Sequence, residues 1–296
     1  MSSETAILKS TGVCSDDAER LAAALEQADA VLIGAGAGLS TSAGLTYSGE
    51  RFERIFDDFV AAYGMTDMYS GGFYRFPTPE EHWGWWSRQI WYNRYEPGPL
   101  PVYRRLFSLV RNRDYFVLTS NVDHQFRLAG FAKDRLFYMQ GDYGLWQCSV
   151  PCHERTYDNK DVVRRMVAEQ KDRCVPSGLV PHCPVCGRPM TMNLHADDTF
   201  VRDEGWFAAN AGYRDFLRRH EGCRMLFWEI GVGFNTPGII KYPFRQMTAE
   251  NPAAVYAVMN LEAPRLPSPA PGRSLWLQGD VGRNLEALER LLAERA

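Results

Sequence analysis

The chain has 296 residues, of which 45% are hydrophobic, so it is long and apolar enough to bury the core of one large domain or two of ordinary size. Its net charge of -3 argues against binding to duplex nucleic acid, which usually needs a basic face. The chain lacks the run of roughly 18 apolar residues that a membrane span needs, and residues 1–15 do not resemble a secretory signal, so we expect an intracellular, cytoplasmic protein with no membrane partner.

Short apolar runs alternate with longer amphipathic stretches, which predicts an α/β fold. Ser15 is a suitable N-cap for a first helix over residues 16–27, which leads to a buried strand over 30–33. The other expected strands are residues 115–119, 136–139, 225–230, 254–260 and 274–277, and the other expected helices are 51–63, 207–220 and 281–295. The pattern favours a Rossmann-like parallel sheet with helices on both faces.

Two segments interrupt this alternation. Residues 73–103 are dense in aromatic side chains, which either pack a helical insert at about 64–100 or line a substrate channel. Residues 148–197 are polar and dotted with proline. We therefore expect a large domain formed by residues 1–147 and 198–296, with a small module inserted at 148–197.

The small module contains two close pairs of cysteines, Cys148 with Cys152 and Cys183 with Cys186. Such spacing favours metal ligation in a reducing compartment over a disulfide framework. Four cysteines would form a closed, structural zinc site, although the neighbouring His153 or His182 could replace one of them. Buried free thiols are the alternative, and the polar surroundings disfavour it.

A glycine-rich loop follows the first strand, over residues 34–44. Small residues between a strand and a helix let the backbone approach a phosphate, so the loop is a candidate dinucleotide cradle, with a flexible turn as the alternative. It lacks the usual G-x-G-x-x-G spacing and the lysine of a P-loop. Polar residues also follow the strand at 115–119, and Gln140 and Asp142 follow the strand at 136–139, which predicts a site at the carboxyl edge of the sheet.

Taken in order, these motifs resemble the sirtuin series over about residues 30–288. The matching segments are Gly36-Ala37-Gly38-Leu39-Ser40, Ser42-Ala43-Gly44-Leu45, Thr119-Ser120-Asn121-Val122-Asp123, Gln140-Gly141, the two cysteine pairs, Gly231-Val232-Gly233, Met259-Asn260-Leu261 and Gly279-Asp280-Val281. The resemblance implies a sirtuin fold that binds NAD, with a small zinc-ribbon and helical module.

Three positions depart from ordinary sirtuins. Gln140 stands where protein deacylases carry a histidine, Ser120 stands where they carry a glutamine, and residues 46–52 differ from the usual proline-aspartate-phenylalanine-arginine stretch. With these changes the chain resembles the macrodomain-linked class of microbial sirtuins. That resemblance implies an NAD-dependent protein ADP-ribosyltransferase that modifies a lipoylated glycine-cleavage H-like carrier protein, with a macrodomain hydrolase that removes the mark.

The resemblance also implies roles for individual residues. Asn121 would orient the ribose or a water, Asp123 would contact the nicotinamide amide, and Gln140 would bind the ribose without acting as a base. The residues implied to bind NAD are Gly36, Ala37, Gly38, Ser40, Gly44, Leu45, Arg51, Ser120, Asn121, Asp123, Gln140, Gly231, Gly233, Asn260, Leu261, Asp280 and Val281. His124 could replace the missing base, but we expect its side chain to point elsewhere, at the start of a helix.

Other functions remain open from the sequence. Water instead of a protein could accept the ADP-ribose, which would make the chain an NAD glycohydrolase. A catalytically silent sensor of NAD or ADP-ribose would bind the nucleotide without releasing nicotinamide. Lysine deacylation is disfavoured, because the carboxamide of Gln140 has no group that titrates near neutral pH.

Overall fold

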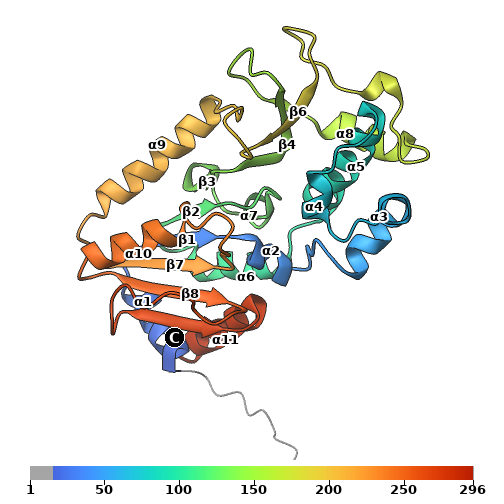
Figure 1. Cartoon of the computed structure of the whole chain (residues 1–296). Coiled ribbons are helices and arrows are strands. Elements are labelled where there is room, and N and C mark those ends of the chain that lie inside the picture. The colour runs from blue at the N-terminus through green and yellow to red at the C-terminus, as the bar shows by residue number, and fades with distance from the viewer. Residues whose placement is uncertain (1–15, 296) are drawn as a thin grey trace, which may run out of the picture.

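The computed structural model describes residues 16–295, in which six parallel strands form the central sheet in the order β3-β2-β1-β7-β8-β9 (Figure 1). These strands are β1 (Ala30–Ala35), β2 (Tyr115–Thr119), β3 (Leu136–Tyr138), β7 (Met225–Ile230), β8 (Val255–Asn260) and β9 (Ser274–Gln278). The strand order reverses at β1, which pairs with β2 on one side and with β7 on the other. Sheets of this kind bind ligands at such a switch point, outside the carboxyl ends of the strands.

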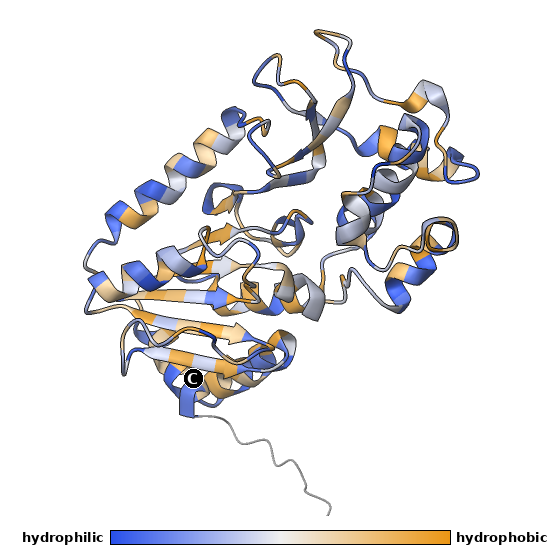
Figure 2. Cartoon of the chain, in the orientation of Figure 1, coloured by the Kyte–Doolittle hydropathy of each residue, from blue (hydrophilic) through white to orange (hydrophobic). Residues whose placement is uncertain are grey.

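Helices cover both faces of the central sheet. They are α1 (Asp16–Gln27), α6 (Pro101–Val110), α9 (Glu204–Arg219), α10 (Lys241–Glu250) and α11 (Val281–Arg295). Val31 and Ile33 of β1 pack with α1, α6 and α11, whereas Leu32 faces α9 and α10. Because both faces are buried, the strands are continuous apolar runs, which are mostly orange in Figure 2. The expected fold class is confirmed.

A second sheet of three antiparallel strands lies beside a group of helices, in the order β5-β4-β6 (Figure 1). Its strands are β4 (Gly141–Cys148), β5 (Tyr157–Asp158) and β6 (Met190–Leu194). The helices on this side are α3 (Glu50–Tyr63), α4 (Met68–Gly72), α5 (Pro79–Ile90), the π-helix η1 (Trp91–Tyr95) and α8 (Lys160–Glu169). The short connecting elements are α2 (Ala37–Ser42), α7 (Gln125–Leu128) and the 3-10 turns η2 (Lys133–Arg135) and η3 (Ser177–Leu179). The domain limits expected at 148 and 197 stay a prediction.

The aromatic segment packs the core of this second half. Trp83, Trp85 and Trp86 of α5 are buried together with Phe56 of α3. The rings of Phe56 and Trp85 lie with their centroids 4.1 Å apart. Aromatic side chains of this size bring a large apolar area into a core, so packing accounts for these tryptophans without a substrate channel.

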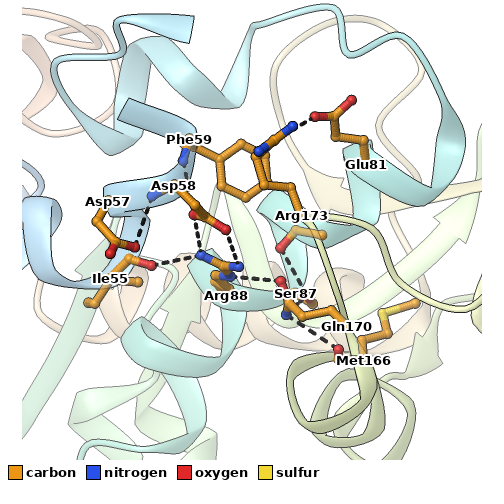
Figure 3. A network of polar contacts seen from close by, with 11 residues as sticks. Ile55, Asp57, Asp58, Phe59, Glu81, Ser87, Arg88, Met166, Gln170 and Arg173 are labelled. Atoms are coloured by element: carbon orange, nitrogen blue, oxygen red, sulfur yellow. Dashed lines mark hydrogen bonds and ion pairs between the residues drawn. The ribbon is translucent and has the colours of Figure 1, made fainter. Parts of the chain in front are cut away.

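Polar contacts at the edge of that core join α3, α5 and the segment after α8 (Figure 3). Arg88 donates to both carboxylate oxygens of Asp58, at 2.7 and 2.8 Å, and to Oε1 of Gln170 at 2.7 Å. Glu81 accepts hydrogen bonds from Tyr63 and from Arg173. The paired geometry at Asp58 fixes the guanidinium in one orientation, and so holds the helices in register.

Several expected elements have the bounds found in the structure. Residues 16–27, 115–119, 225–230 and 281–295 form α1, β2, β7 and α11 as expected. Strand β1 continues to Ala35 because Gly34 and Ala35 still pair with both neighbouring strands. Ser15, the expected N-cap, lies outside the described residues. Within residues 16–295, every helix is too short or too polar to cross a bilayer.

Candidate functional site

The glycine-rich loop packs directly against the loop that follows β7. The amides of Gly36 and Gly38 donate to the carbonyls of Ile230 and Gly231, at 3.0 and 2.8 Å. A Cβ on Gly36 would lie 2.8 Å from the Gly231 oxygen, and one on Gly38 would lie 2.7 Å from the Gly231 Cα. These glycines therefore allow two backbones to approach closely at the switch point, and their amides are already paired.

A buried polar cluster lies beside that contact, at the carboxyl ends of β1 and β2. Ser40 Oγ lies 2.5 Å from Asp123 Oδ2 and 2.7 Å from Tyr103 Oη. Asn121 Nδ2 donates to the Gly36 carbonyl at 3.0 Å and lies 3.1 Å from Tyr103 Oη. The structure thus brings together Ser40, Asn121 and Asp123, three of the residues implied to act on NAD.

Burial determines the protonation of this cluster. It raises the pKa of Asp123 above the usual aspartate range, although the hydrogen bonds from Ser40 and from the Gln125 amide oppose the rise. Burial, together with the charge of Asp123, also raises the pKa of Tyr103 well above its ordinary value. The tyrosine is therefore a neutral hydroxyl that can hold Ser40 and Asn121 in place.

A cavity of about 530 Å³ opens beside the cluster, along the carboxyl ends of β7, β8 and β9. The expected NAD-binding residues that line it are Ala37, Gly38, Gly231, Gly233, Asn260, Leu261, Asp280 and Val281. Asp280 Oδ2 accepts from Ser42 Oγ at 2.8 Å, and Asn260 Nδ2 donates to the Val232 carbonyl at 3.0 Å. These bonds orient both polar side chains at the rim of the cavity.

One wall of the cavity contains a buried ion pair that sequence reasoning missed. Lys241 and Tyr256 both line the cavity, and both donate to the fully buried carboxylate of Glu229. Burial raises the pKa of Tyr256 far above its ordinary value. A buried carboxylate needs such partners, because an unpaired charge in the interior is costly.

Other expected NAD-binding residues lie apart from the cavity lining. Arg51, on α3, donates to the carbonyls of Thr46 and Tyr92 at 2.9 and 2.6 Å and to Asn93 Oδ1 at 3.1 Å. Its guanidinium is therefore engaged within the helical half of the protein. The backbone amide of Ser120 donates to the Ala35 carbonyl at 3.1 Å, which joins the two strand ends.

Three more of the expected residues, Gly44, Leu45 and Gln140, lie outside the cavity lining. The amide of Leu45 donates to the Ser40 carbonyl at 2.9 Å, and Gly44 just before it has a φ of 98°, which glycine adopts without strain. Gln140 follows β3, and its carbonyl accepts from the amide of His195 at 3.0 Å.

His124 differs from our expectation. It does precede α7 as the N-cap residue, but its side chain makes no capping hydrogen bond. Instead, Nδ1 lies 2.9 Å from Asp142 Oδ2, and the ring stacks on Tyr138 with the planes at 8°. The side chain is thus directed toward the loop that carries Gln140, and not away from the site.

The four paired cysteines converge as expected. The Sγ atoms of Cys148, Cys152, Cys183 and Cys186 all lie within 4.8 Å of one another. Burial would raise the pKa of Cys148, but backbone hydrogen bonds from Cys152 and Val150 lower it to about 6, whereas burial raises the pKa of Cys152 to about 12. The fit to a zinc ion therefore rests on the convergence of four sulfur ligands.

The flanking histidines differ from each other. His153 Nδ1 lies 2.9 Å from Cys152 Sγ, and its Nε2 lies 2.8 Å from Tyr157 Oη. His182 Nδ1 instead lies 3.0 Å from the Val180 carbonyl. His153 is therefore a neighbour of the cysteine cluster, whereas His182 contacts its own loop.

Two curated relatives match most of this chain, and no protein-family model does. The chain is 38% identical over 265 residues to a protein ADP-ribosyltransferase of Staphylococcus aureus (strain Mu50 / ATCC 700699), a match that covers 89% of this chain and 84% of that relative. It is 31% identical to a probable bifunctional ADP-ribose hydrolase/ADP-ribosyltransferase of Fusarium oxysporum f. sp. cubense, covering 89% of this chain and 46% of the fungal protein.

Solved Sir2 structures are similar to the fold described above. One, from a study of the mechanism and regulation of Sir2 enzymes, aligns over 95% of this chain and 99% of its own, with a TM-score of 0.59 and 16% identity. A Sir2 homologue in complex with NAD aligns over 94% of each chain, with a TM-score of 0.59 and 15% identity. At such low identity these likenesses establish the architecture.

Proposed function

The chain belongs to the sirtuin-fold protein ADP-ribosyltransferases and is an NAD-dependent enzyme of that family, and from this premise we propose that its acceptor is a lipoylated glycine-cleavage H-like carrier protein. In the reaction, the bond between nicotinamide and ribose C1′ breaks, and its electron pair leaves with nicotinamide. A nucleophile on the carrier then forms the new bond to C1′.

The buried cluster of Ser40, Asn121, Asp123 and Tyr103 is the observation that supports the transfer chemistry of this proposal, whereas the carrier as acceptor rests on the resemblance of the sequence. It supplies oriented, neutral donors and one carboxyl group next to a cavity large enough for a nucleotide. Preorganised polar groups of this kind stabilise charge as it develops on the ribose, because they do not have to reorient during the reaction. In our proposal Asp123 contacts the nicotinamide amide and Asn121 orients the ribose.

Gln140 has a separate part in the proposal. A carboxamide can hydrogen-bond a ribose hydroxyl, but it cannot remove a proton near neutral pH. Transfer of ADP-ribose to an acceptor does not require a proton from the nicotinamide ribose hydroxyls. Gln140 is therefore compatible with the transferase reaction and disfavours lysine deacylation.

The cavity along β7, β8 and β9 is proposed to hold the adenosine half of NAD. Gly233 and Asn260 would contact the ribose of the adenosine, and Asp280 with Val281 would contact the adenine. All four line the cavity. Arg51, Ser120, Gly44 and Leu45 remain proposed contacts of the other half of NAD; Arg51 would first have to release its bonds to Thr46, Tyr92 and Asn93.

The cysteine cluster is proposed to bind one zinc ion through Cys148, Cys152, Cys183 and Cys186. With four protein ligands the ion has no open position for substrate, so it supplies stability to the small module and not chemistry. The remaining partner in the proposal is a macrodomain hydrolase that removes the mark. The name of the fungal relative, which couples an ADP-ribose hydrolase with the transferase, supports this pairing.

The test is nicotinamide release from NAD by the purified protein, with the lipoylated carrier, the same carrier without lipoate, or an acetylated peptide. We expect release to depend on the lipoylated carrier, which should gain the mass of one ADP-ribose while the peptide stays unchanged. Release without any carrier would identify a glycohydrolase. Nucleotide binding without release would identify a sensor, and loss of the acetyl group would identify a deacylase.

A further inference from the structure

Asp142 connects three separate segments at the edge of the site. Its Oδ1 accepts from Arg94 Nε and from the Gly144 amide, both at 2.7 Å. Its Oδ2 lies 2.9 Å from His124 Nδ1 and accepts from Arg94 Nη2 at 3.3 Å. The side chain is only 13% exposed. Asp142 therefore joins the π-helix η1, the loop after β2 and the start of β4.

The partner from the loop after β2, His124, has an unusual backbone. Its φ is 64°, in the left-handed region, which costs a residue with a side chain about 1 kcal/mol or more. The ring does not cap α7, so capping does not explain the strain. It stacks instead on Tyr138, with the ring centroids 5.1 Å apart, and reaches Asp142. The left-handed backbone of His124 therefore places its ring against Asp142.

The partner from the helical half, Arg94, lies in the π-helix η1, an arrangement that is rare and often found at functional sites. Its neighbours make contacts in other directions. Asn93 Oδ1 accepts from Arg51 at 3.1 Å, and Tyr95 Oη donates to Asn159 Oδ1 at 2.7 Å. Arg94 is thus held by the packing of η1, and it brings a fixed positive charge to Asp142.

The charge of Asp142 is stable. Burial would raise its pKa, but the contact with His124 Nδ1 at 2.9 Å and the charge of Arg94 together hold the pKa at about 2. The bonds from Arg94 Nε and from the Gly144 amide, both at 2.7 Å, hold this buried carboxylate in one orientation, because hydrogen bonds to a charged group at such a distance are strong and directional.

The junction lies between the two sides of the site. Asp142 follows Gln140 by two positions, and His124 follows Asp123 directly. The two loops also meet through their backbones, since the Tyr143 amide donates to the Val122 carbonyl at 3.1 Å. A change at Asp142 would therefore move Gln140 relative to Asp123 without touching the cavity along β7, β8 and β9.

We propose that Asp142, clamped by Arg94 and His124, is a positioning residue for ADP-ribosyl transfer that fixes the Gln140 loop against the loop carrying Asn121 and Asp123. This inference rests on the function proposed above. Asp142 does not itself meet the substrate. It acts through the placement of Gln140, and small displacements of positioning groups have large effects on rate.

The test compares three variants of the full-length protein. Asp142→Asn keeps the shape but removes the charge, and His124→Asn removes the imidazole while keeping a residue that tolerates the left-handed region. Asp215→Asn is the matched control, because this aspartate pairs with arginines on the exposed face of α9. We expect both site variants to lower kcat for nicotinamide release by about 10- to 100-fold, with KM for NAD nearly unchanged.

The double variant Asp142→Asn/His124→Asn shows whether the two residues act together or lower the rate independently. If both residues act through one junction, the double variant loses no more rate than Asp142→Asn alone. Losses that multiply, or variants with wild-type kcat, would overturn the inference.

Hydrogen exchange of peptides covering residues 138–146 gives a readout that does not depend on activity. We expect faster exchange there in Asp142→Asn and wild-type exchange in Asp215→Asn. Unchanged exchange in Asp142→Asn would overturn the inference even if the activity fell. Absence of nicotinamide release in the wild-type protein would instead refute the proposed function, and the exchange measurement would still decide the role of Asp142.

Discussion

Ser40 and Asp123 lie 2.5 Å apart, Oγ to Oδ2, although one residue belongs to α2 and the other follows β2. The contact joins the segments that follow two neighbouring parallel strands, β1 and β2, on one side of the switch point. It gives a buried carboxyl group one of its few donors, together with the Gln125 amide. The stability of the fold and the geometry of the site therefore depend on the same hydrogen bond.

Replacing Ser40 with alanine should lower the stability of the fold and disturb the geometry of the site. The change leaves Asp123 and Tyr103 without a partner at Ser40, and an unsatisfied buried polar group costs about 1–3 kcal/mol. We expect a lower Tm and slower nicotinamide release. Ser108→Ala is the control, because the Ser108 hydroxyl is exposed and bonds to the Arg105 carbonyl and to Glu289 of α11, away from the buried cluster. Equal behaviour of the two variants would show that the Ser40 hydroxyl is dispensable.

Asn121→Ala should abolish nicotinamide release. The side chain donates to the Gly36 carbonyl, lies against Tyr103 Oη and is 7% exposed, so the change removes a fixed polar group from the buried cluster. We expect the variant to remain folded, as measured by circular dichroism, and still to bind ADP-ribose through the separate cavity along β7, β8 and β9. Residual release near the wild-type rate would contradict the role proposed for Asn121.

The buried pair of Lys241 and Glu229 allows a test of the cavity wall. Lys241→Met should destabilise the protein by about 3–5 kcal/mol, because it leaves a buried carboxylate without its cation. The double variant Lys241→Met/Glu229→Gln should recover most of that loss, since the uncompensated charge is gone. Chemical denaturation measures both free energies of unfolding. A double variant as unstable as the single one would mean that packing, and not charge, determines the cost.

Acid should destabilise the protein partly through Asp142. Its pKa is about 2 in the folded state against an ordinary value of 3.8. The unfolded chain therefore binds more protons between these values, so the contribution of Asp142 is fully present above pH 3.8 and is lost as the pH falls through about 2. The difference corresponds to about 2 kcal/mol. Unfolding curves from pH 5 to pH 2 should show this loss in the wild type and not in Asp142→Asn.

Zinc removal should unfold the small module. Cys183→Ser removes one of the four converging thiols, so we expect zinc content to fall and the Tm to drop. Cys223→Ser is the matched control, because Cys223 lies outside the cluster and should leave the zinc content unchanged. Elemental analysis and thermal unfolding give the two readouts. A Cys183→Ser protein with full zinc content would mean that another residue, such as His153, serves as a ligand.

The central sheet was accessible from the sequence because its strands are continuous apolar runs bounded by polar turns. A helical insert was expected at about 64–100, but the bounds of α5 within it were not. Trp83, Gly84, Trp85, Trp86 and Ser87 are all buried in succession, so the helix is covered on most sides and its limits are not marked by a single polar face. Strand β4 was missed as well, since its inward and outward positions are both largely buried.

Some residues of the candidate site could likewise be predicted from the sequence, and others could not. Asn121, Asp123 and Ser40 could be located because they follow strands of the sheet, where ligands bind in this class of fold. Tyr103 could not, since it comes from the first turn of a helix on another segment and reaches the cluster only through tertiary packing. The junction at Asp142 depends on Arg94 and on a left-handed backbone at His124, and neither leaves a local pattern in the sequence.

The π-helix η1 also bears on how this part of the chain can change during evolution. It continues α5 without a break and directs Asn93, Arg94 and Tyr95 to three different segments. Deleting one residue would restore the ordinary helical period and rotate the following side chains by about 100°. A point substitution in this segment would remove one of these contacts, whereas the deletion of a single codon would break all three at once. In homologous genes, the length of this segment should therefore vary less than its composition.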